Sequence, residues 1–559
     1  MTDTRLILDY IYDHEAQRAT QVLLTQPTGA GVVVDYTWQQ TLDQARRMAA
    51  HLISLELEPG ARIALLAKNS AHFFMAELAI WMAGGTTVAI FPTETPDNVR
   101  YVLEHSEASL LFVGKLDAWD LQKAAMPADM PTITLPLSPA TGFAAWEQIV
   151  ARTAPLAGRP GRNASDIAML LYTSGSTGQP KGVMQSFGSI TRAAELLVDE
   201  LDATLGADSA QRMLSYLPLA HAYERACIEC TSFVRGSGQV FFTESLATFM
   251  DDLKRARPTF FHSVPRLWAK LQQGVLANLP QAQLDAMLDN PATAAAVQRK
   301  VLASLGLDEV VRALSGSAPI PAELILWYRR LGLNLLEGYA MTEDFCVSHA
   351  STPEASAAGY VGVPLPGVLV RMAEDGEVLI KSPGAMVGYY KLPALNAECF
   401  TPDGFFHTGD LGERNAEGLL KITGRKKELF KTAKGKYIAP APIENRLNAH
   451  PMVELSMVSG VGQPMPYAIV VLDENLRPRL GDAAVRTQVA TELAKLLQDV
   501  NAALAQHERL HRLVVAREPW SIDNGCLTPT LKIKRSRIES AAAPQVDAWY
   551  AGTSPVLWA

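Results

Sequence analysis

Short apolar runs alternate with longer helical segments through about the first four hundred residues, an order typical of βαβ units. Arg62–Ala67 has the composition of a buried strand, and residues 70–83 have that of a core helix. Residues 73–91 form the most apolar region, but Glu77 and a Gly84-Gly85 pair interrupt it, which favours helix, turn and strand over a membrane span. The pattern therefore predicts an α/β fold with largely parallel sheets.

A second, smaller domain is predicted near the C-terminus. At 559 residues the chain exceeds the size at which one hydrophobic core keeps growing. The strand-rich pattern gives way to a charged connection at residues 424–428, and the remainder fits a small α+β domain. We therefore expect a large N-terminal domain over residues 1–426 and a smaller, mobile domain over residues 427–559. Residues 276–299 are rich in Ala, Gln and Leu, which predicts a helical insertion.

The composition is that of an ordinary globular protein, and it limits the partners that we expect. A net charge of −8 argues against a general nucleic-acid or anionic-membrane surface, because both require an excess of Lys and Arg. The first ten residues have no apolar run of the signal-peptide type, so we expect a cytoplasmic protein without a transmembrane segment. Oligomeric state and peripheral contact with a membrane stay open.

The five cysteines do not indicate a disulfide framework, which agrees with a reducing compartment. Cys227 and Cys230 form a CxxC pair, but no second pair or Cys/His cluster follows at the spacing of a zinc site. We interpret the two residues as a structural pair in an apolar segment, with a redox or metal role as the alternative.

A loop rich in glycine and hydroxyl groups follows the apolar run Ile167–Tyr172 and has the composition of a phosphate-binding loop. Its glycines let backbone N–H groups approach phosphate oxygens, its hydroxyls add donors, and its lysine adds a cation. The spacing differs from that of a Walker loop, which argues against an ordinary P-loop NTPase. The candidate binding residues are Thr173, Ser174, Gly175, Ser176, Thr177, Gly178 and Lys181.

The stretch Tyr172–Gly182 resembles the signature of the AMP-forming acyl-CoA synthetases, a family of adenylate-forming enzymes. Further segments resemble the same family in the same order: Ser315–Pro319, Gly338–Glu343, His407–Asp410, Ile422–Arg425 and Asn524–Lys532. Three others resemble its long-chain fatty acid branch: Tyr216–Arg225, Arg257–Trp268 and Lys434–Glu444. The resemblance implies that the protein activates a carboxylic acid, here a medium- or long-chain fatty acid, as its acyl-AMP. The acyl group then passes to coenzyme A, so ATP, Mg²⁺ and coenzyme A are the expected cofactors and co-substrates.

The resemblance also gives roles to residues of the nucleotide site. Thr342 is suited to hydrogen-bond the α-phosphate, and Glu343 to hold Mg²⁺, which prefers oxygen ligands. Asp410 offers acceptor oxygens to the two ribose hydroxyls, and Arg425 adds a charged contact beside it. Tyr339, after Gly338, would lie flat on adenine. The other side of the base would be closed by Ser317, Ala318 and Pro319.

Four more residues are assigned by the resemblance to the acid site and to domain movement. His221 falls where the family has an aromatic residue or histidine beside the reacting carboxylate. Lys532 corresponds to a lysine that reaches the active site during adenylation. Lys427 corresponds to the residue about which the small domain rotates, and Gly435 to a glycine beside the pantetheine channel.

Three positions depart from the family pattern. Phe187 stands where many long-chain members have a histidine, Ala340 replaces a common glycine, and Leu531 replaces the glycine that precedes the catalytic lysine in most other branches. None removes a charge that the mechanism needs, although the first two leave the preferred acid open. Three alternatives remain at this stage: a ligase that loads a carrier protein, an aryl-CoA ligase, and a non-catalytic sensor of acyl chains or nucleotide.

Overall fold

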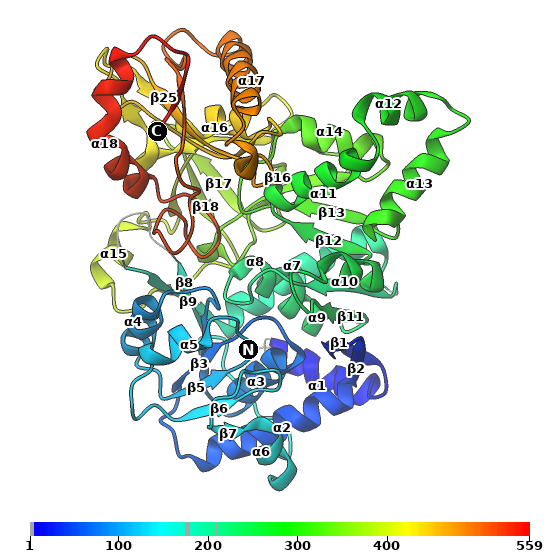
Figure 1. Cartoon of the computed structure of the whole chain (residues 1–559). Helices are drawn as coiled ribbons and strands as arrows, with labels where there is room; N and C mark the ends of the chain where they lie inside the picture. The colour runs from blue at the N-terminus through cyan, green and yellow to red at the C-terminus, as the bar shows by residue number, and fades with distance from the viewer. Residues whose placement is uncertain (1–4, 174–178, 208) are drawn as a thin grey trace.

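The computed structural model describes residues 5–173, 179–207 and 209–559. A large N-terminal domain forms the lower part and the right side of the molecule in Figure 1, and a smaller C-terminal domain lies at the upper left. The hydrophobic cores of the two domains are separate. Apolar side chains packed into the large domain extend to Ile422, and those of the small domain begin at Phe430.

The longest sheet of the large domain contains the strands that the sequence pattern predicts. Its order is β19–β9–β8–β4–β3–β5–β6–β7, and the strands from β8 to β7 are parallel. Their bounds are β3 (Arg62–Leu66), β4 (Thr86–Ile90), β5 (Leu110–Val113), β6 (Thr132–Thr134), β7 (Ala144–Ala145), β8 (Ile167–Thr173), β9 (Lys181–Ser186) and β19 (Gly388–Tyr389). The predicted βαβ architecture is confirmed, with β9 and β19 added as antiparallel strands.

Two further sheets of this domain mix parallel and antiparallel pairs. The first has the order β10–β11–β1–β2, and the second has the order β12–β13–β14–β15–β16. The first contains β1 (Val22–Gly29), β2 (Val32–Thr37), β10 (Gln211–Ser215) and β11 (Gly238–Phe242). The second contains β12 (Phe260–Ser263), β13 (Arg312–Ser315), β14 (Leu335–Tyr339), β15 (His349–Ala350) and β16 (Val363–Pro364).

Helix α3 (Ala71–Met82) shows why the apolar region of residues 73–91 is not a membrane span. The Ser70 hydroxyl caps its first turn by accepting from the Phe73 N–H at 3.2 Å. Every residue of α3 is buried, because the helix packs along α2 (Trp38–Ser54) and also contacts β4 of the longest sheet and β1 of the neighbouring one. The other helices before residue 240 are α1 (Ile7–Gln17), α4 (Pro96–Ser106), α5 (Trp119–Gln122), the 3₁₀ helix η1 (Lys123–Ala125), α6 (Trp146–Arg152), α7 (Phe187–Leu205), α8 (Ala222–Glu224), the π-helix η2 (Arg225–Cys230) and α9 (Thr231–Arg235).

The predicted helical insertion is present as an arm that projects to the upper right in Figure 1. It consists of α12 (Gln281–Asp289) and α13 (Ala294–Leu305), which follow α11 (Pro265–Asn278). The remaining helices of the large domain are α10 (Phe249–Ala256), α14 (Ala322–Arg330) and α15 (Pro393–Glu398). Within the described ranges, no helix combines the length and apolarity needed to cross a membrane.

The last part of the large domain differs from the parallel pattern expected there. The strands β17 (Leu369–Met372), β18 (Glu377–Lys381), β20 (Phe406–Arg414) and β21 (Leu420–Arg425) form an antiparallel sheet in that order. Turns such as Ala373–Gly376 and Asn415–Gly418 connect consecutive strands. Connections this short join antiparallel neighbours, whereas a parallel crossover needs a dozen or more residues.

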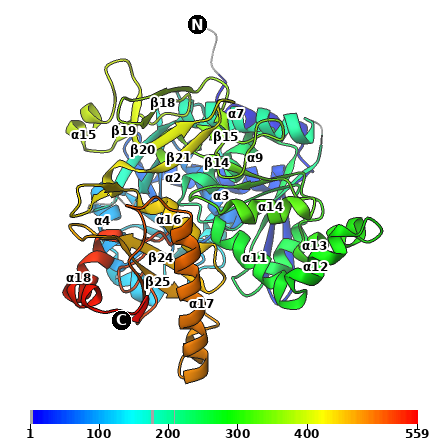
Figure 2. The ribbon, with the colours of Figure 1, turned by 90° about the horizontal axis from the view of Figure 1, so that it is seen from above.

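The small domain is α+β, as predicted, and its central sheet is covered on both faces. The sheet has the order β24 (Val453–Ser459), β25 (Tyr467–Leu472), β26 (Leu513–Val515) and β27 (Val556–Trp558), and a short hairpin pairs β22 (Phe430–Lys431) with β23 (Tyr437–Ile438). Alternate side chains of β25 pack into different cores. One core includes α16 (Pro440–Asn448) and α17 (Ala483–Ala502), and the other includes α18 (Arg535–Ala551). Helix α17 extends well beyond the sheet (Figure 2).

Candidate active site

Asp410 and Arg425 are brought together by the ladder between β20 and β21, in which they are direct partners. The Arg425 Nε donates to Asp410 Oδ1 at 2.9 Å, and the Tyr339 hydroxyl donates to Asp410 Oδ2 at 2.7 Å. Asp410 is only 5% exposed, so its carboxylate is oriented by two protein donors. Each oxygen can still accept a further hydrogen bond, as a pair of ribose hydroxyls would require.

Tyr339 and Gly338 end strand β14 beside this carboxylate. Burial, followed by the Asp410 charge, raises the pKa of Tyr339 well above its usual range, so the phenol stays protonated and donates. Gly338 pairs with Ala350, and a Cβ built on Gly338 would make only ordinary contacts, the nearest at 3.5 Å from Leu314. The tyrosine is thus fixed through its hydroxyl at the edge of the candidate nucleotide site.

The loop Ser317–Pro319 follows β13, the neighbour of β14 in the sheet. Ser317 has a φ of 68°, a left-handed conformation that non-glycine residues rarely adopt. Its side chain is half-buried, whereas Ala318 and Pro319 are exposed. The loop therefore lies at the end of the strand next to Tyr339, with two apolar side chains open to solvent.

Thr342 and Glu343 lie in the short 3₁₀ helix η3 (Thr342–Asp344) after β14. The buried Asp344 shapes this turn, because its Oδ1 accepts from Met341 N at 2.9 Å and from Cys346 N at 3.1 Å. The Gln185 amide of β9 donates to the Thr342 carbonyl at 2.9 Å. This contact joins the turn to the strand that follows the phosphate loop.

The Glu343 carboxylate is oriented by Tyr389 of β19, whose hydroxyl donates to Glu343 Oε1 at 2.8 Å. Lys181 Nζ lies 5.4 Å from the centre of the same ring. Because Tyr389 lies against both side chains, Lys181 and the Glu343 carboxylate are close to each other. Lys181 is the cross-strand partner of Thr173, at the base of the phosphate loop. The candidates Ser174, Gly175, Ser176, Thr177 and Gly178 lie outside the described residues.

His221 caps the short helix α8, and its Nδ1 accepts from the Tyr223 N–H at 3.1 Å. Burial is the main reason that its pKa falls to about 3, and the charge of Lys532 lowers it further. The imidazole is therefore neutral at physiological pH. Because Nδ1 is an acceptor, the ring proton is on Nε2.

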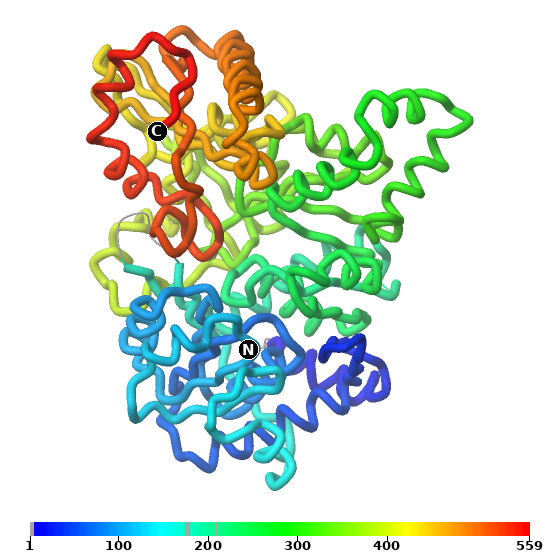
Figure 3. Tube along the Cα trace, viewed as in Figure 1, coloured from blue at the N-terminus to red at the C-terminus, as the bar shows by residue number. Residues whose placement is uncertain are grey.

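Lys532 reaches this region from the small domain, on the segment before α18 that descends toward the large domain in Figure 3. Thr528 holds its turn, since the Thr528 N–H donates to the Lys532 carbonyl at 2.8 Å and Lys532 N donates to Thr528 Oγ1 at 3.1 Å. The Lys532 side chain is exposed, although charged groups of both domains lie close enough to act on it. Desolvation by the nearby protein, followed by the Arg425 charge, lowers the pKa of Lys532 to about 8, against the opposing influence of Asp410 and Glu343.

Two candidates lie apart from this cluster. Lys427 is an exposed residue of the 3₁₀ helix η4 (Lys426–Glu428), at the connection between the two cores. Gly435 has a φ of 77° in the exposed turn between β22 and β23, and a Cβ built there would come no closer to the described atoms than 3.8 Å, from Lys431. The arrangement in this structure thus brings Lys532, but not Gly435, to the candidate nucleotide site.

Two models of known protein families match the sequence of this chain. The model of the AMP-binding enzyme family matches residues 15–390, which is more than half of the chain. The chain belongs to the AMP-binding enzyme family. The model of the AMP-binding enzyme C-terminal domain matches residues 428–554.

Curated relatives in this family match nearly the whole chain. The long-chain-fatty-acid–CoA ligase FadD15 of Mycobacterium tuberculosis is 30% identical, over 97% of this chain and 96% of its own length. Long-chain-fatty-acid–CoA ligase 1 of Homo sapiens is 28% identical, over 88% of this chain and 78% of its own.

Solved structures of AMP-binding enzymes share the fold. The adenylation domain of carboxylic acid reductase from Segniliparus rugosus, in complex with AMP and a co-purified carboxylic acid, aligns with a TM-score of 0.79 at 20% identity. That alignment covers 98% of this chain and 94% of the other. The anthranilate CoA ligase AuaEII, in complex with anthranoyl-AMP, aligns with a TM-score of 0.77 at 21% identity and covers 98% of this chain and 99% of its own.

Several polar residues that orient the cluster were not predicted from the sequence. Tyr389 holds Glu343, and Gln185 holds the Thr342 carbonyl. Asn69 and Glu224 hold the loop that carries His221. None lies in a segment with glycine or charge spacing that points to a ligand, although Glu224 falls inside the Tyr216–Arg225 segment quoted for the long-chain branch. Phe187, which stands where many long-chain members of the family have a histidine, is fully buried against Trp81 in the hydrophobic core.

Proposed function

We propose that this protein activates a fatty acid with ATP as its acyl-AMP and then transfers the acyl group to coenzyme A. The observation that carries the proposal is the position of Lys532, a small-domain cation whose charge acts on Asp410, Glu343 and His221 of the large domain. Such a site offers separate groups for a nucleotide, a metal ion and a carboxylic acid. The names of the curated relatives and the three long-chain segments support a fatty acid as substrate.

Binding of ATP would use groups that are already oriented. Asp410 would accept hydrogen bonds from the ribose hydroxyls, with Arg425 and Tyr339 holding the carboxylate in place. The ring of Tyr339 and the loop Ser317–Pro319 would take the adenine between them. Lys181, Thr342 and the loop 173–178 would contact the phosphates, whose charge the lysine partly offsets.

Glu343 fits a magnesium ion on the chemistry of its donor atoms. Its Oε1 accepts from Tyr389, which leaves Oε2 available as an oxygen ligand. No cluster of three His, Cys, Asp or Glu side chains suited to a metal occurs in residues 5–173, 179–207 and 209–559. A single carboxylate is sufficient for this ion, because Mg²⁺ usually takes its other ligands from water and substrate phosphates. When bound, the ion would supply positive charge at the phosphates.

In the first step, a carboxylate oxygen of the acid attacks the α-phosphorus of ATP, and the bond from that phosphorus to the bridging oxygen breaks. Pyrophosphate leaves and acyl-AMP remains. The neutral His221 can donate from Nε2 to the attacking carboxylate and orient it without adding a charge. Lys532 in its charged form would stabilise the negative charge that gathers around phosphorus in the transition state.

In the second step, the sulfur of coenzyme A attacks the acyl carbonyl carbon, AMP leaves, and the thiol proton passes to solvent. Lys532 must move away to admit the thiol, so we propose that the small domain rotates at Lys427. This proposal sets the domain boundary between residues 426 and 427. Support comes from the separate cores, which end at Ile422 and begin at Phe430, and from the exposed connection between them.

Pyrophosphate release, measured over saturated, unsaturated and aromatic acids with and without coenzyme A, tests this function. We expect AMP and pyrophosphate only when an acid is present, and an acyl-CoA product only with coenzyme A. ADP and phosphate as products would contradict the proposal. A preference for aromatic acids would favour an aryl-CoA ligase, and acyl-AMP that coenzyme A does not consume would favour loading of a carrier protein. Absence of turnover with every acid would favour a sensor.

A further inference from the structure

The loop Tyr216–His221, between β10 and α8, is closed by a buried carboxylate. Glu224 is fully buried and its Oε1 accepts from the Ser215 hydroxyl at 2.7 Å and from Tyr216 N at 3.0 Å. Its Oε2 lies 3.0 Å from His262 Nε2. Ser215 is the last residue of β10, Tyr216 is the first of the loop, and Glu224 follows the end of the loop. The carboxylate therefore joins the two ends of the segment that carries His221.

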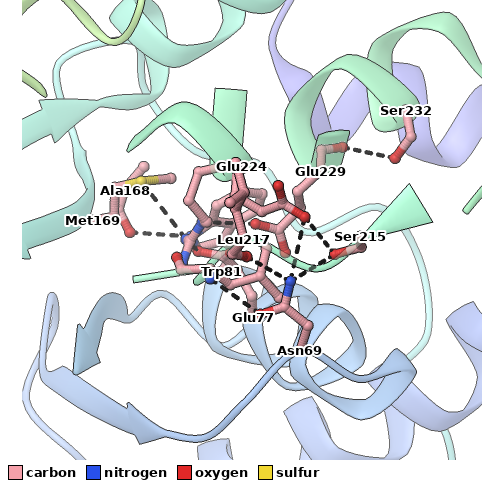
Figure 4. Close-up of polar contacts among 12 residues, drawn as sticks. Asn69, Glu77, Trp81, Ala168, Met169, Ser215, Leu217, Glu224, Glu229 and Ser232 are labelled. Atoms are coloured by element: carbon pink, nitrogen blue, oxygen red, sulfur yellow. Dashed lines mark hydrogen bonds and ion pairs between the residues drawn. The ribbon is translucent and has the colours of Figure 1, made fainter. Parts of the chain in front are cut away.

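Asn69, which also donates to Glu224 at 3.3 Å, holds the middle of the same loop. Its Nδ2 donates to the Leu217 carbonyl at 2.7 Å and to the Ser215 hydroxyl at 2.8 Å, and its Oδ1 accepts from Leu219 N at 3.2 Å. The Asn69 side chain is 7% exposed and points toward Ser215 and Glu224 (Figure 4). The Asn69 side chain thus hydrogen-bonds the peptide groups of Leu217 and Leu219, four and two residues before His221.

A third anchor comes from the π-helix η2 that follows α8. Arg225 is fully buried and donates from Nη1 to the Leu219 carbonyl at 3.3 Å. It forms ion pairs with Glu77 of α3 and with Glu229, the latter at 2.6 Å. Because both glutamates are also fully buried, the guanidinium has little freedom to move. Leu219 is therefore fixed through its N–H by Asn69 and through its carbonyl by Arg225.

We propose that Asn69 and Glu224 are positioning residues, which act on acyl-AMP formation by holding His221 at the reacting carboxylate. The inference rests on the proposed function. Their bonds end on peptide groups of the loop, so loss of either would free the backbone that carries the imidazole. Position matters at this site, since a displacement of about 1 Å can slow a reaction by roughly a hundredfold. Neither residue contacts the substrates in this scheme.

A double-mutant cycle separates positioning from general stability. Asn69→Ala should slow single-turnover acyl-AMP formation by roughly 10- to 100-fold in the parent protein, by the loss of orientation. In a His221→Ala background the same change should slow it by less than about threefold, because the group that it positions is absent. Equal losses in both backgrounds would overturn the proposal. The parent reaction is the control for the proposed function, which fails separately if no acid yields acyl-AMP.

Glu224→Gln provides a second cycle that keeps the shape of the side chain. The amide oxygen can still accept from Ser215 and Tyr216, so this variant should lose less activity than Glu224→Ala, and its loss should also shrink in the His221→Ala background. The result decides the proposal even if Asn69→Ala does not fold. A Glu224→Gln loss that is the same in both backgrounds would refute positioning.

Asn501→Ala is a matched control. Asn501 is an asparagine of the small domain that brackets Leu510 in the same way, accepting from its N–H at 2.8 Å and donating to its carbonyl at 2.9 Å. Its loss should lower thermal stability to a similar degree while acyl-AMP formation stays within about twofold of the parent. In ¹⁵N-histidine spectra, the His221 signal, assigned by its loss in His221→Ala, should shift in Asn69→Ala and stay in place in Asn501→Ala. An unmoved signal in Asn69→Ala would contradict the proposal.

Discussion

The side chains of Lys532 and Arg425 bring two positive charges from different domains close enough for one to lower the pKa of the other. Desolvation and then the Arg425 charge lower the pKa of Lys532 to about 8, while Asp410 and Glu343 oppose the shift. The lysine therefore titrates near physiological pH before ATP binds. A bound triphosphate would raise its pKa again, because negative charge favours the ammonium.

The first prediction concerns the pH dependence of acyl-AMP formation. In the proposed mechanism the reaction uses the charged lysine, which is the form present below a pKa of about 8. The kcat/KM for ATP should therefore be level below that pKa and fall by roughly tenfold per pH unit above it. Lys532→Arg keeps its charge throughout this range and should lose the alkaline limb, whatever its absolute rate. Initial rates of pyrophosphate release across the pH range would check this. If the activity of both proteins falls in the same way at high pH, the group that titrates is not Lys532.

The second prediction separates the two steps by removing the lysine. Lys532→Ala should slow acyl-AMP formation by at least roughly 10²–10³-fold, as for the loss of one preorganised donor. With presynthesised acyl-AMP and coenzyme A, the variant should form acyl-CoA at nearly the parent rate. Single-turnover assays of each step are the measurement. An equal loss in both steps would mean that Lys532 is structural, and no loss in the first would mean that another lysine is used.

A third prediction tests the ribose contact. Asp410→Ala should weaken ATP binding by roughly 1.5–3 kcal/mol, the usual value of a hydrogen bond to a charged group. The variant also removes the acceptor of Tyr339, so Tyr339→Phe is the matched control, which loses that hydrogen bond and keeps the ring. Titration calorimetry with ATP should show a much smaller change for Tyr339→Phe. ATP affinity that is unchanged in Asp410→Ala would rule out the assignment.

The fourth prediction uses ion pairs that join the domains in this arrangement. Arg266 of α11 pairs with Glu454 of the small domain, and Lys270 pairs with Glu474 at 2.9 Å. Partly exposed pairs contribute up to about 1 kcal/mol, so Glu474→Lys should slow acyl-AMP formation by up to roughly fivefold. The charge-swapped pair, Lys270→Glu with Glu474→Lys, should recover most of the rate. Stopped-flow measurements at low and high salt would detect both effects, and a double variant as slow as the single one would count against the pair.

Much of the site could be predicted because its groups lie in short contiguous segments. Asp410 and Arg425 are fifteen residues apart and lie on the two strands of one hairpin. Their contact could therefore be expected from the two sequence segments that contain them. Leu531 replaces a glycine of the family pattern, and it has a φ of 60°, in the left-handed region that favours glycine. The turn before Lys532 therefore keeps the backbone conformation that a glycine would adopt most easily.

The rest depends on contacts between distant segments that local patterns do not encode. Tyr389 meets Glu343 across 46 residues, and Asn69 meets Glu224 across 155. Polar residues such as Asn69 are common in loops, and only tertiary packing shows that this one is buried with its amide directed at peptide groups. The antiparallel sheet of residues 369–425 was missed for a related reason, since alternating β-type runs do not by themselves give strand direction.

The buried group of Glu77, Arg225 and Glu229 makes folding a proton-consuming reaction. Two carboxylates share one guanidinium without water, and burial, partly offset by Arg225, raises the pKa of Glu229 well above that of a free glutamate. Between the ordinary glutamate pKa and the raised one, the folded chain thus holds a carboxyl proton that the unfolded chain releases. This part of the stability is present in full below the ordinary glutamate pKa and is lost as the pH rises through the raised value. The calorimetric heat of unfolding within this pH interval should accordingly vary with the ionisation enthalpy of the buffer, which absorbs the released proton.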